Sequence, residues 1–186
     1  MDIIKDLVLV FWFFGPGGLA NLAAFYSGKL PYLKDWSYPI DFHKKFRGKR
    51  IFGAHKTIRG FVVAIIVSIA VVYLSVFLYD RFAFVRQWIS IDYRHINPIL
   101  LGFLLGFGAL AGDAVKSFFK RQMGIAPGKS WFPFDQLDYI FGVIVFTAFY
   151  IQLTMMQYVL LCLLWFAIHP FSTLMGYFFK QREEPL

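Results

Sequence analysis

Long apolar segments alternate with shorter polar ones along this chain. A helix that crosses the hydrocarbon core of a bilayer needs about 20 mostly apolar residues. The pattern predicts five such helices, of which the third and fourth are short for a full crossing. They cover residues 7–26, 60–79, 98–115, 139–153 and 158–179. We therefore expect an all-α integral membrane bundle of about five transmembrane helices, built as a single domain over residues 1–186.

The composition supports a membrane protein. Hydrophobic residues make up 59% of the chain and charged residues 16%, whereas soluble domains carry about 45–50% and about 25%. The formal charge is +8, but basic residues in membrane proteins usually reflect orientation or attraction to anionic lipid. Because only the charge would suggest nucleic acid, we expect membrane lipids as partners and no nucleic acid.

The basic residues are concentrated in segments that would share one side of the membrane. Segments 27–59 and 113–138, together with the tail after residue 179, contain fifteen of the nineteen Lys and Arg residues. Such segments stay preferentially in the cytoplasm. We expect a multi-pass protein of the cell membrane with its N-terminus outside and its C-terminus and polar segments in the cytoplasm.

The third apolar segment carries two pairs of glycines spaced four residues apart, Gly102 with Gly106 and Gly108 with Gly112. Small residues at this spacing let the backbones of membrane helices approach closely. The pairs therefore predict a helix packed tightly against its neighbours.

Candidate chemistry begins where the third apolar segment ends. If the helix continues, Asp113, Lys116, Ser117 and Lys120 lie on one face. An Asp113–Lys116 ion pair on an amphipathic extension is the structural alternative. A carboxylate at the C-terminal end of a membrane helix opposes the helix dipole, and ionisable groups near the bilayer are costly and usually functional. These arguments favour a functional role for Asp113.

Two more carboxylates, Asp135 and Asp138, open the fourth predicted helix. Acidic residues there could simply cap the helix. Together with Asp113, however, they would supply three oxygen ligands beside Lys120 and Arg121. Carboxylates suit a divalent cation and the basic groups suit a polyphosphate.

The first polar segment contains a second group of candidate residues. Its basic run, residues 44–50, is typical of a segment that faces anionic lipid or holds orientation. The residues that lead into the second helix combine glycines, a hydroxyl group and fixed cations, which suit phosphate oxygens. They are Gly53, His55, Lys56, Thr57, Arg59 and Gly60.

The spacing of these polar positions matches a family signature. The matching runs are Pro39-Ile40-Asp41-Phe42, Gly53 to Gly60, Gly112-Asp113 to Lys120-Arg121, Gly124 to Ser130, and Asp135-Gln136-Leu137-Asp138. They resemble the signature of CDP-archaeol synthases, which are related to the bacterial CDP-diacylglycerol synthases. The diacylglycerol branch typically has Arg where this chain has Gln136, so the archaeol branch is favoured.

The resemblance implies a CTP-dependent cytidylyltransferase of phospholipid biosynthesis. It would convert CTP and an unsaturated isoprenoid ether-lipid phosphate into CDP-archaeol and pyrophosphate, with Mg²⁺ as cofactor. We expect a catalytic group formed by Asp113, Asp135 and Asp138, which would hold Mg²⁺, and Lys120. Lys56, Arg59, Lys120 and Arg121 would bind the triphosphate, with Thr57, Ser117 and His55 as further contacts.

Two other functions stay open at this point. A CTP-dependent polyprenol or phytol kinase would use similar nucleotide-binding parts but transfer the γ-phosphoryl group and release CDP. A small transporter or membrane scaffold would not be an enzyme. Transporters place ionisable groups near the bilayer midplane, often within inverted repeats, whereas the interiors of the apolar segments here lack charged residues and no repeat is visible.

Overall fold

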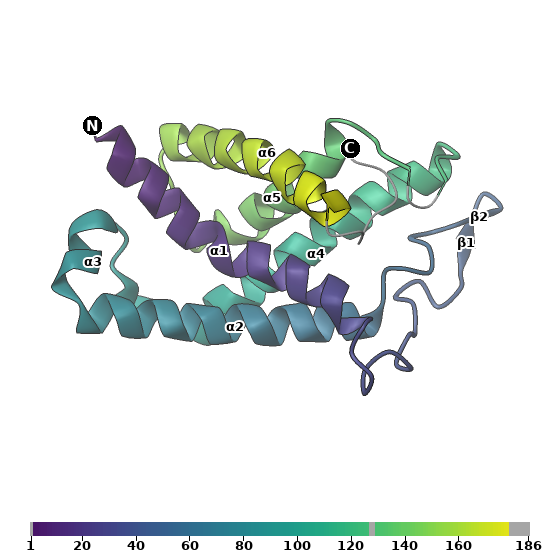
Figure 1. The fold of residues 1–186 in the computed structure, drawn as a ribbon, viewed down its shortest axis with the longest axis horizontal. Coiled ribbons are helices and arrows are strands. Elements are labelled where there is room, and N and C mark those ends of the chain that lie inside the picture. The colour runs from purple at the N-terminus through teal and green to yellow at the C-terminus, as the bar shows by residue number, and fades with distance from the viewer. Residues whose placement is uncertain (1, 127–128, 179–186) are drawn as a thin grey trace.

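The computed structural model describes residues 2–126 and 129–178, with side chains described up to residue 168. Within this part, five long helices run back and forth (Figure 1), so the all-α class and the five-helix prediction are confirmed. The long helices are α1 (Ile3–Ser27), α2 (Ile58–Arg81), α4 (Pro98–Gln122), α5 (Phe134–Thr147) and α6 (Met155–Phe178). Shorter elements lie between them: β1 (Lys45–Phe46), β2 (Lys49–Arg50), α3 (Ala83–Trp88) and the 3-10 helix η1 (Tyr93–His95).

Side-chain caps explain where the long helices begin. The Asp2 carboxylate accepts hydrogen bonds from the first backbone N–H groups of α1, and the Thr57 hydroxyl accepts one from Gly60 at the start of α2. Asn97 caps α4, whose first residue is Pro98. Such caps satisfy N–H groups that have no partner within the helix.

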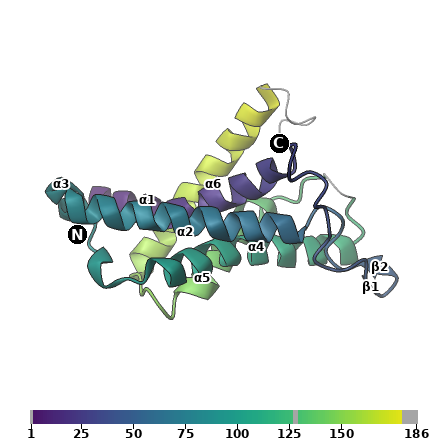
Figure 2. The same cartoon turned by 90° about the horizontal axis from the view of Figure 1, so that it is seen from below.

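Among the described residues, three helices, α1, α2 and α4, are long and apolar enough to cross a membrane. The 14-residue α5 is about 21 Å long, which is less than the roughly 30 Å hydrocarbon core. In Figure 2, α1, α2 and α4 lie roughly along one axis, with α2 antiparallel to the other two, while the C-terminal half of α6 leans away from them. The connections from α1 to α2 and from α4 to α5 lie at the same end of the bundle (Figure 1).

Helix α4 is longer than the apolar pattern predicts. It continues to Gln122, and α5 begins at Phe134, so most of the polar segment 113–138 is helical rather than a loop. Lys120 and Arg121 lie in the last turn of α4, where cations stabilise a helix. The dipole argument for Asp113 was therefore wrong, because the dipole acts mainly within the last turn and the helix extends well beyond Asp113.

One pair of glycines on α4 packs against α2. A Cβ atom added to Gly102 would lie 2.4 Å from the Cα of Ile69, and one added to Gly106 would lie 2.9 Å from the carbonyl oxygen of Ala64. Neither position has room for a side chain. The predicted close approach of the helices is confirmed on this side of α4.

The second pair packs against α5. A Cβ atom on Gly108 would lie 2.9 Å from the carbonyl oxygen of Gly142, and one on Gly112 would lie 2.1 Å from the carbonyl oxygen of Asp138. The contact at Gly112 places the turn of α4 that carries Asp113 directly against the start of α5. This packing brings two of the candidate carboxylates, Asp113 on α4 and Asp138 on α5, close to each other.

We predict that Gly112→Ala destabilises the protein. The added methyl group would push α5 away from α4, and overpacking of this kind costs about 1–3 kcal/mol. Thermal unfolding in detergent should show a lower midpoint for this variant. Gly15→Ala in α1 is the matched control, because its added methyl group meets no atom within 4 Å and alanine favours a helix. An unchanged midpoint for Gly112→Ala would contradict the tight contact.

Candidate active site

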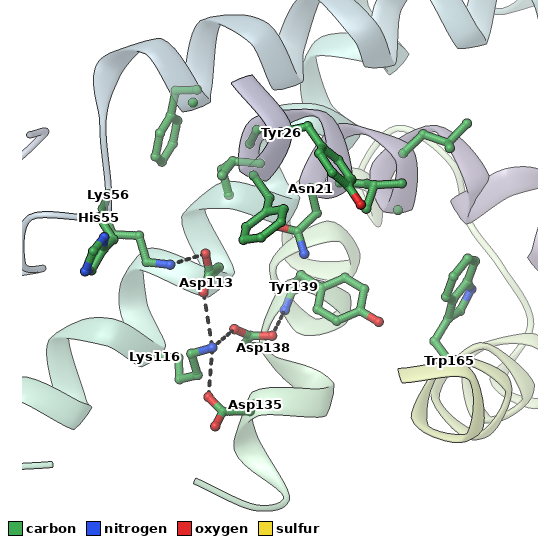
Figure 3. Close-up of a pocket in the computed structure, with 18 of the residues that line it drawn as sticks. Asn21, Tyr26, His55, Lys56, Asp113, Lys116, Asp135, Asp138, Tyr139 and Trp165 are labelled. Carbon is green, nitrogen blue, oxygen red and sulfur yellow. Dashed lines mark hydrogen bonds and ion pairs between the residues drawn. The ribbon is translucent and has the colours of Figure 1, made fainter. Parts of the chain in front are cut away.

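A pocket of about 780 Å³ lies between the helices and joins an apolar region to a polar one. Figure 3 shows the charged side chains gathered on one side of the pocket, with Trp165 on the other. The apolar part is lined by α1 and α6, through Phe11, Leu19, Leu22, Phe25, Trp165 and Ile168. The polar part is lined by His55, Lys56, Asp113, Lys116, Asp135 and Asp138.

Lys116 lies at the centre of the polar part. Its Nζ atom is 3.1 Å from Oδ1 of Asp113, 2.9 Å from Oδ1 of Asp135 and 2.7 Å from Oδ2 of Asp138. The three carboxylates come from two helices and converge on this one ammonium group (Figure 3). From the sequence, Lys116 was predicted only as a possible structural partner of Asp113, and its contacts with α5 were not predicted. The available signal was its place on the same helical face as Asp113 and Lys120.

Two more lysines complete the cluster. Lys56 forms an ion pair with Asp113. The Nζ atom of Lys120 lies 3.1 Å from Oδ2 of Asp135 and also donates a hydrogen bond to the carbonyl oxygen of Lys129. We define the three carboxylates with Lys56, Lys116 and Lys120 as the Asp–Lys cluster. Its three acidic and three basic groups balance, so its formal charge is zero.

Backbone groups fix two of the carboxylates as well. The backbone N–H of Tyr139 donates to Oδ1 of Asp138 at 2.7 Å, and that of Trp131 donates to Oδ2 of Asp135 at 2.5 Å. Charge-assisted bonds of this kind are stronger than neutral ones. The two carboxylates are therefore held in place by backbone groups of α5 and of the residues just before it, as well as by the lysines.

The segment that carries His55 and Lys56 is held by a different acid, Asp41. This buried carboxylate accepts hydrogen bonds from the guanidinium of Arg50, at 2.6 and 3.1 Å, and from the backbone N–H groups of Phe52 and Gly53 at 3.1 Å. Burial raises the pKa of Asp41, but these hydrogen bonds outweigh it and lower the pKa to about 2. Asp41 thus fixes the backbone just before His55 and Lys56, the two residues of this segment that line the polar part of the pocket.

Two predicted phosphate ligands have structural partners at the start of α2. Thr57 and Arg59 both line the pocket, and the Thr57 hydroxyl caps α2. The Arg59 guanidinium donates to the Ser27 hydroxyl at 3.1 Å and to the Leu33 and Lys34 carbonyl oxygens at 2.9 and 3.1 Å. Arg59 therefore ties α2 to the end of α1, and its phosphate contact stays a prediction.

Three other predicted residues are not among those that line the pocket. Ser117 and Lys120 are buried on α4. The Nε atom of Arg121 is buried and has no hydrogen-bond partner among the described residues. A residue that we did not assign to the site, Asn21, does line the pocket and points into it from α1 (Figure 3).

The chemistry of the carboxylates fits a magnesium ion, since Mg²⁺ prefers oxygen ligands. Within the described part of the chain, however, no three His, Cys, Asp or Glu side chains form a group that could hold a metal ion as they stand. The ammonium group of Lys116 takes the space between Asp113, Asp135 and Asp138. A metal ion would have to share or take over these oxygens.

These features define a multi-pass membrane protein whose pocket joins an apolar wall to a cluster of carboxylates and ammonium groups. The model of a protein family described as CarS-like, CDP-archaeol synthase, matches residues 2–185. The chain therefore belongs to the CDP-archaeol synthase family, as its motifs had indicated.

Individual relatives agree with this membership. The chain is 34% identical over 177 residues to a CDP-archaeol synthase of Methanopyrus kandleri, covering 94% of this chain and 90% of the relative. It is 31% identical to a CDP-archaeol synthase of Saccharolobus islandicus, covering 100% of this chain and 99% of the relative. A solved structure of an intramembrane enzyme for archaeal membrane lipid biosynthesis has the same fold, with a TM-score of 0.67 and 23% identity, and the match covers 87% of this chain and 90% of that one.

We predict that Asp41 makes the stability of the protein depend on acidic pH. Its pKa lies at about 2 in the folded protein, below the ordinary value of 3.8 for an aspartate side chain. Its contribution is therefore fully present above about pH 4 and is lost as the pH falls toward about 2. The shift corresponds to about 2 kcal/mol. The unfolding midpoint in detergent should fall over this range, and Asp41→Asn should be less stable at neutral pH and lose this part of the pH dependence.

The matched control for this experiment is Asp92→Asn. Asp92 pairs with Arg94 at an exposed position, and exposed pairs contribute little to stability. If Asp41→Asn followed the wild-type pH profile throughout, the assigned role of Asp41 would be wrong.

Proposed function

We propose that this chain is a cytidylyltransferase that forms CDP-archaeol and pyrophosphate from CTP and an unsaturated isoprenoid ether-lipid phosphate. Its membership of the CDP-archaeol synthase family supports this activity. The observation that carries the proposal is the pocket, whose apolar wall suits isoprenoid chains and whose charged end suits phosphate groups.

The reaction transfers the cytidylyl group to the lipid phosphate. An oxygen of that phosphate attacks the α-phosphorus of CTP, a new phosphorus–oxygen bond forms, and the bond to the β-phosphate breaks. Pyrophosphate leaves with the bonding electron pair. No protein base is required, because a phosphate monoester is already anionic at neutral pH. The protein must position the two phosphates and offset their charge.

The Asp–Lys cluster would provide both functions. Asp113, Asp135 and Asp138 would hold Mg²⁺, which neutralises negative charge on phosphate oxygens when bound. Lys56 and Lys116 line the pocket and would donate to the phosphates. The other contacts predicted for CTP come from Arg59, Lys120 and Arg121, with His55, Thr57 and Ser117.

The lipid would enter along α1 and α6. Leu19 and Leu22 on α1 and Trp165 and Ile168 on α6 line the apolar wall. Asn21 lies between this wall and the cluster (Figure 3), where the polar glycerol phosphate would be placed. The charged end of the pocket would then face the cytoplasm, the compartment that contains CTP, with the N-terminus of the chain outside.

We expect product analysis to test the activity directly. With CTP labelled on the α-phosphorus and the ether-lipid phosphate, the purified protein should form labelled CDP-lipid and pyrophosphate. Asp113→Asn should keep its fold but lose most of the turnover, because the cluster loses a carboxylate charge and an amide binds Mg²⁺ poorly. In a parallel assay with an isoprenoid alcohol in place of the lipid phosphate, release of CDP together with the phosphorylated alcohol would instead support the kinase. An ester-lipid phosphate assayed in parallel would measure the linkage preference.

Orientation is tested by labelling in intact cells. A cysteine introduced as Lys45→Cys in the exposed β1 strand should resist a membrane-impermeant thiol reagent, because we place this segment in the cytoplasm. An Arg94→Cys variant, in the connection between α2 and α4, should react readily. Strong labelling at position 45 would reverse the proposed orientation.

A further inference from the structure

We propose that Lys116 is a built-in cation that occupies the space between the three carboxylates until CTP and a divalent metal ion bind together. This inference rests on the proposed function, because it concerns the binding of the same metal and nucleotide. In this role, Lys116 couples the binding of the metal ion to the binding of CTP, so that the metal ion binds weakly alone and tightly when CTP is present.

The geometry of the ammonium group is the first support. A lysine ammonium has three N–H donors, and the Nζ atom of Lys116 has three carboxylate partners at 2.7–3.1 Å. All its donors can therefore be used within the cluster. The side chain is only 15% exposed, so little of the ammonium group remains for water. The ammonium group of Lys116 therefore occupies the position that a bound metal ion would take between the three carboxylates.

Space is the second support. Magnesium binds oxygen at about 2.0–2.1 Å, closer than the ammonium nitrogen lies to any of these oxygens. The same three oxygens cannot close around a metal ion while the ammonium group stays between them. Metal binding at this position therefore requires Lys116 to leave at least part of the cluster.

Charge is the third support. The Asp–Lys cluster is already neutral, since Lys56, Lys116 and Lys120 balance its carboxylates. A divalent cation that entered alone would face three ammonium groups without a net negative charge to attract it. Free metal should therefore bind weakly.

CTP changes this balance because its triphosphate carries about four negative charges and offers new acceptors for the ammonium groups. A lysine has a flexible four-carbon stem, so Lys116 could turn from the carboxylates to a phosphate without a movement of α4. The freed carboxylates could then bind the metal. Metal and nucleotide would consequently favour each other's binding, by the same factor in both directions.

A purely structural role for Lys116 makes a different prediction. If Lys116 only held α4 and α5 together, its removal would lower stability without improving metal binding. In the proposed role, removal lowers stability without metal and increases metal affinity. Metal affinity therefore separates the two roles, independently of enzyme turnover.

The first experiment measures Mn²⁺ binding to the detergent-solubilised protein by electron paramagnetic resonance, without nucleotide. Lys116→Met should bind Mn²⁺ about tenfold more tightly than the wild type, because the metal no longer displaces charged hydrogen bonds. Mn²⁺ should also raise the unfolding midpoint of the variant more than that of the wild type. Lys45→Met, which removes one exposed charge outside the cluster, is the control and should behave as the wild type.

The second experiment uses the unaltered protein, so it does not depend on the variant folding. A water-soluble acetylating reagent should modify Lys116 slowly without ligands, as quantified by mass spectrometry of the peptide. Mn²⁺ alone should speed this modification several-fold only at the high concentrations that its weak binding without nucleotide requires, because the displaced amine then becomes accessible. Lys116→Gln, which keeps a hydrogen-bond donor, provides a second variant for the Mn²⁺ titration.

The outcomes distinguish this inference from the proposed function. Equal Mn²⁺ affinity in the wild type and the Lys116 variants, or a Lys116 modification rate that Mn²⁺ does not change, would overturn the displacement. Absence of Mn²⁺ binding in every protein, even with CTP, would overturn the carboxylate metal site as well. The transferase reaction itself is decided separately, by the labelled product.

Discussion

The contact between α4 and α5 at Gly112 is the constraint on which the site depends. The Asp138 carbonyl oxygen lies so close to Gly112 that a Cβ atom would approach it to 2.1 Å. Only this approach allows Lys116 on α4 to reach Asp135 and Asp138 on α5 at hydrogen-bond distance. Charges near a bilayer are costly unless they are paired, so the packing of the helices and the pairing of the charges support each other.

A second constraint comes from the two environments that the substrates occupy. A lipid phosphate keeps its chains in the bilayer, whereas CTP is soluble in water. The pocket joins an apolar wall on α1 and α6 to charged groups on α4 and α5. The first polar segment lies along the charged end of the pocket. Its backbone is held there by hydrogen bonds to Asp41 and by an antiparallel β-bridge between Pro39 and Thr57. One small domain can thus bring the two substrates together at the membrane surface.

Much of the fold followed from local pattern alone. Hydropathy predicted the five helices, and the glycine spacing predicted close packing of α4, because both signals depend on residues near one another in sequence. The motif around Asp113, Asp135 and Asp138 also indicated the family. The ends of the helices were less predictable. Helix α4 extends into polar sequence and has Lys120 and Arg121 in its last turn. Because this part of the helix packs against protein, it does not need an apolar surface throughout.

The membrane class, the family and the three carboxylates at the pocket could thus all be predicted from local sequence pattern. The cation that contacts all three carboxylates depends on how the helices pack. Lys116 lies at the centre, whereas Arg59 donates to the backbone carbonyl oxygens of Leu33 and Lys34 in the segment after α1. The physical reason is that a side chain's partners depend on how helices rotate and approach one another. Spacing along the chain places Lys116 on the face of Asp113, but the packing of α5 is what surrounds it with carboxylates.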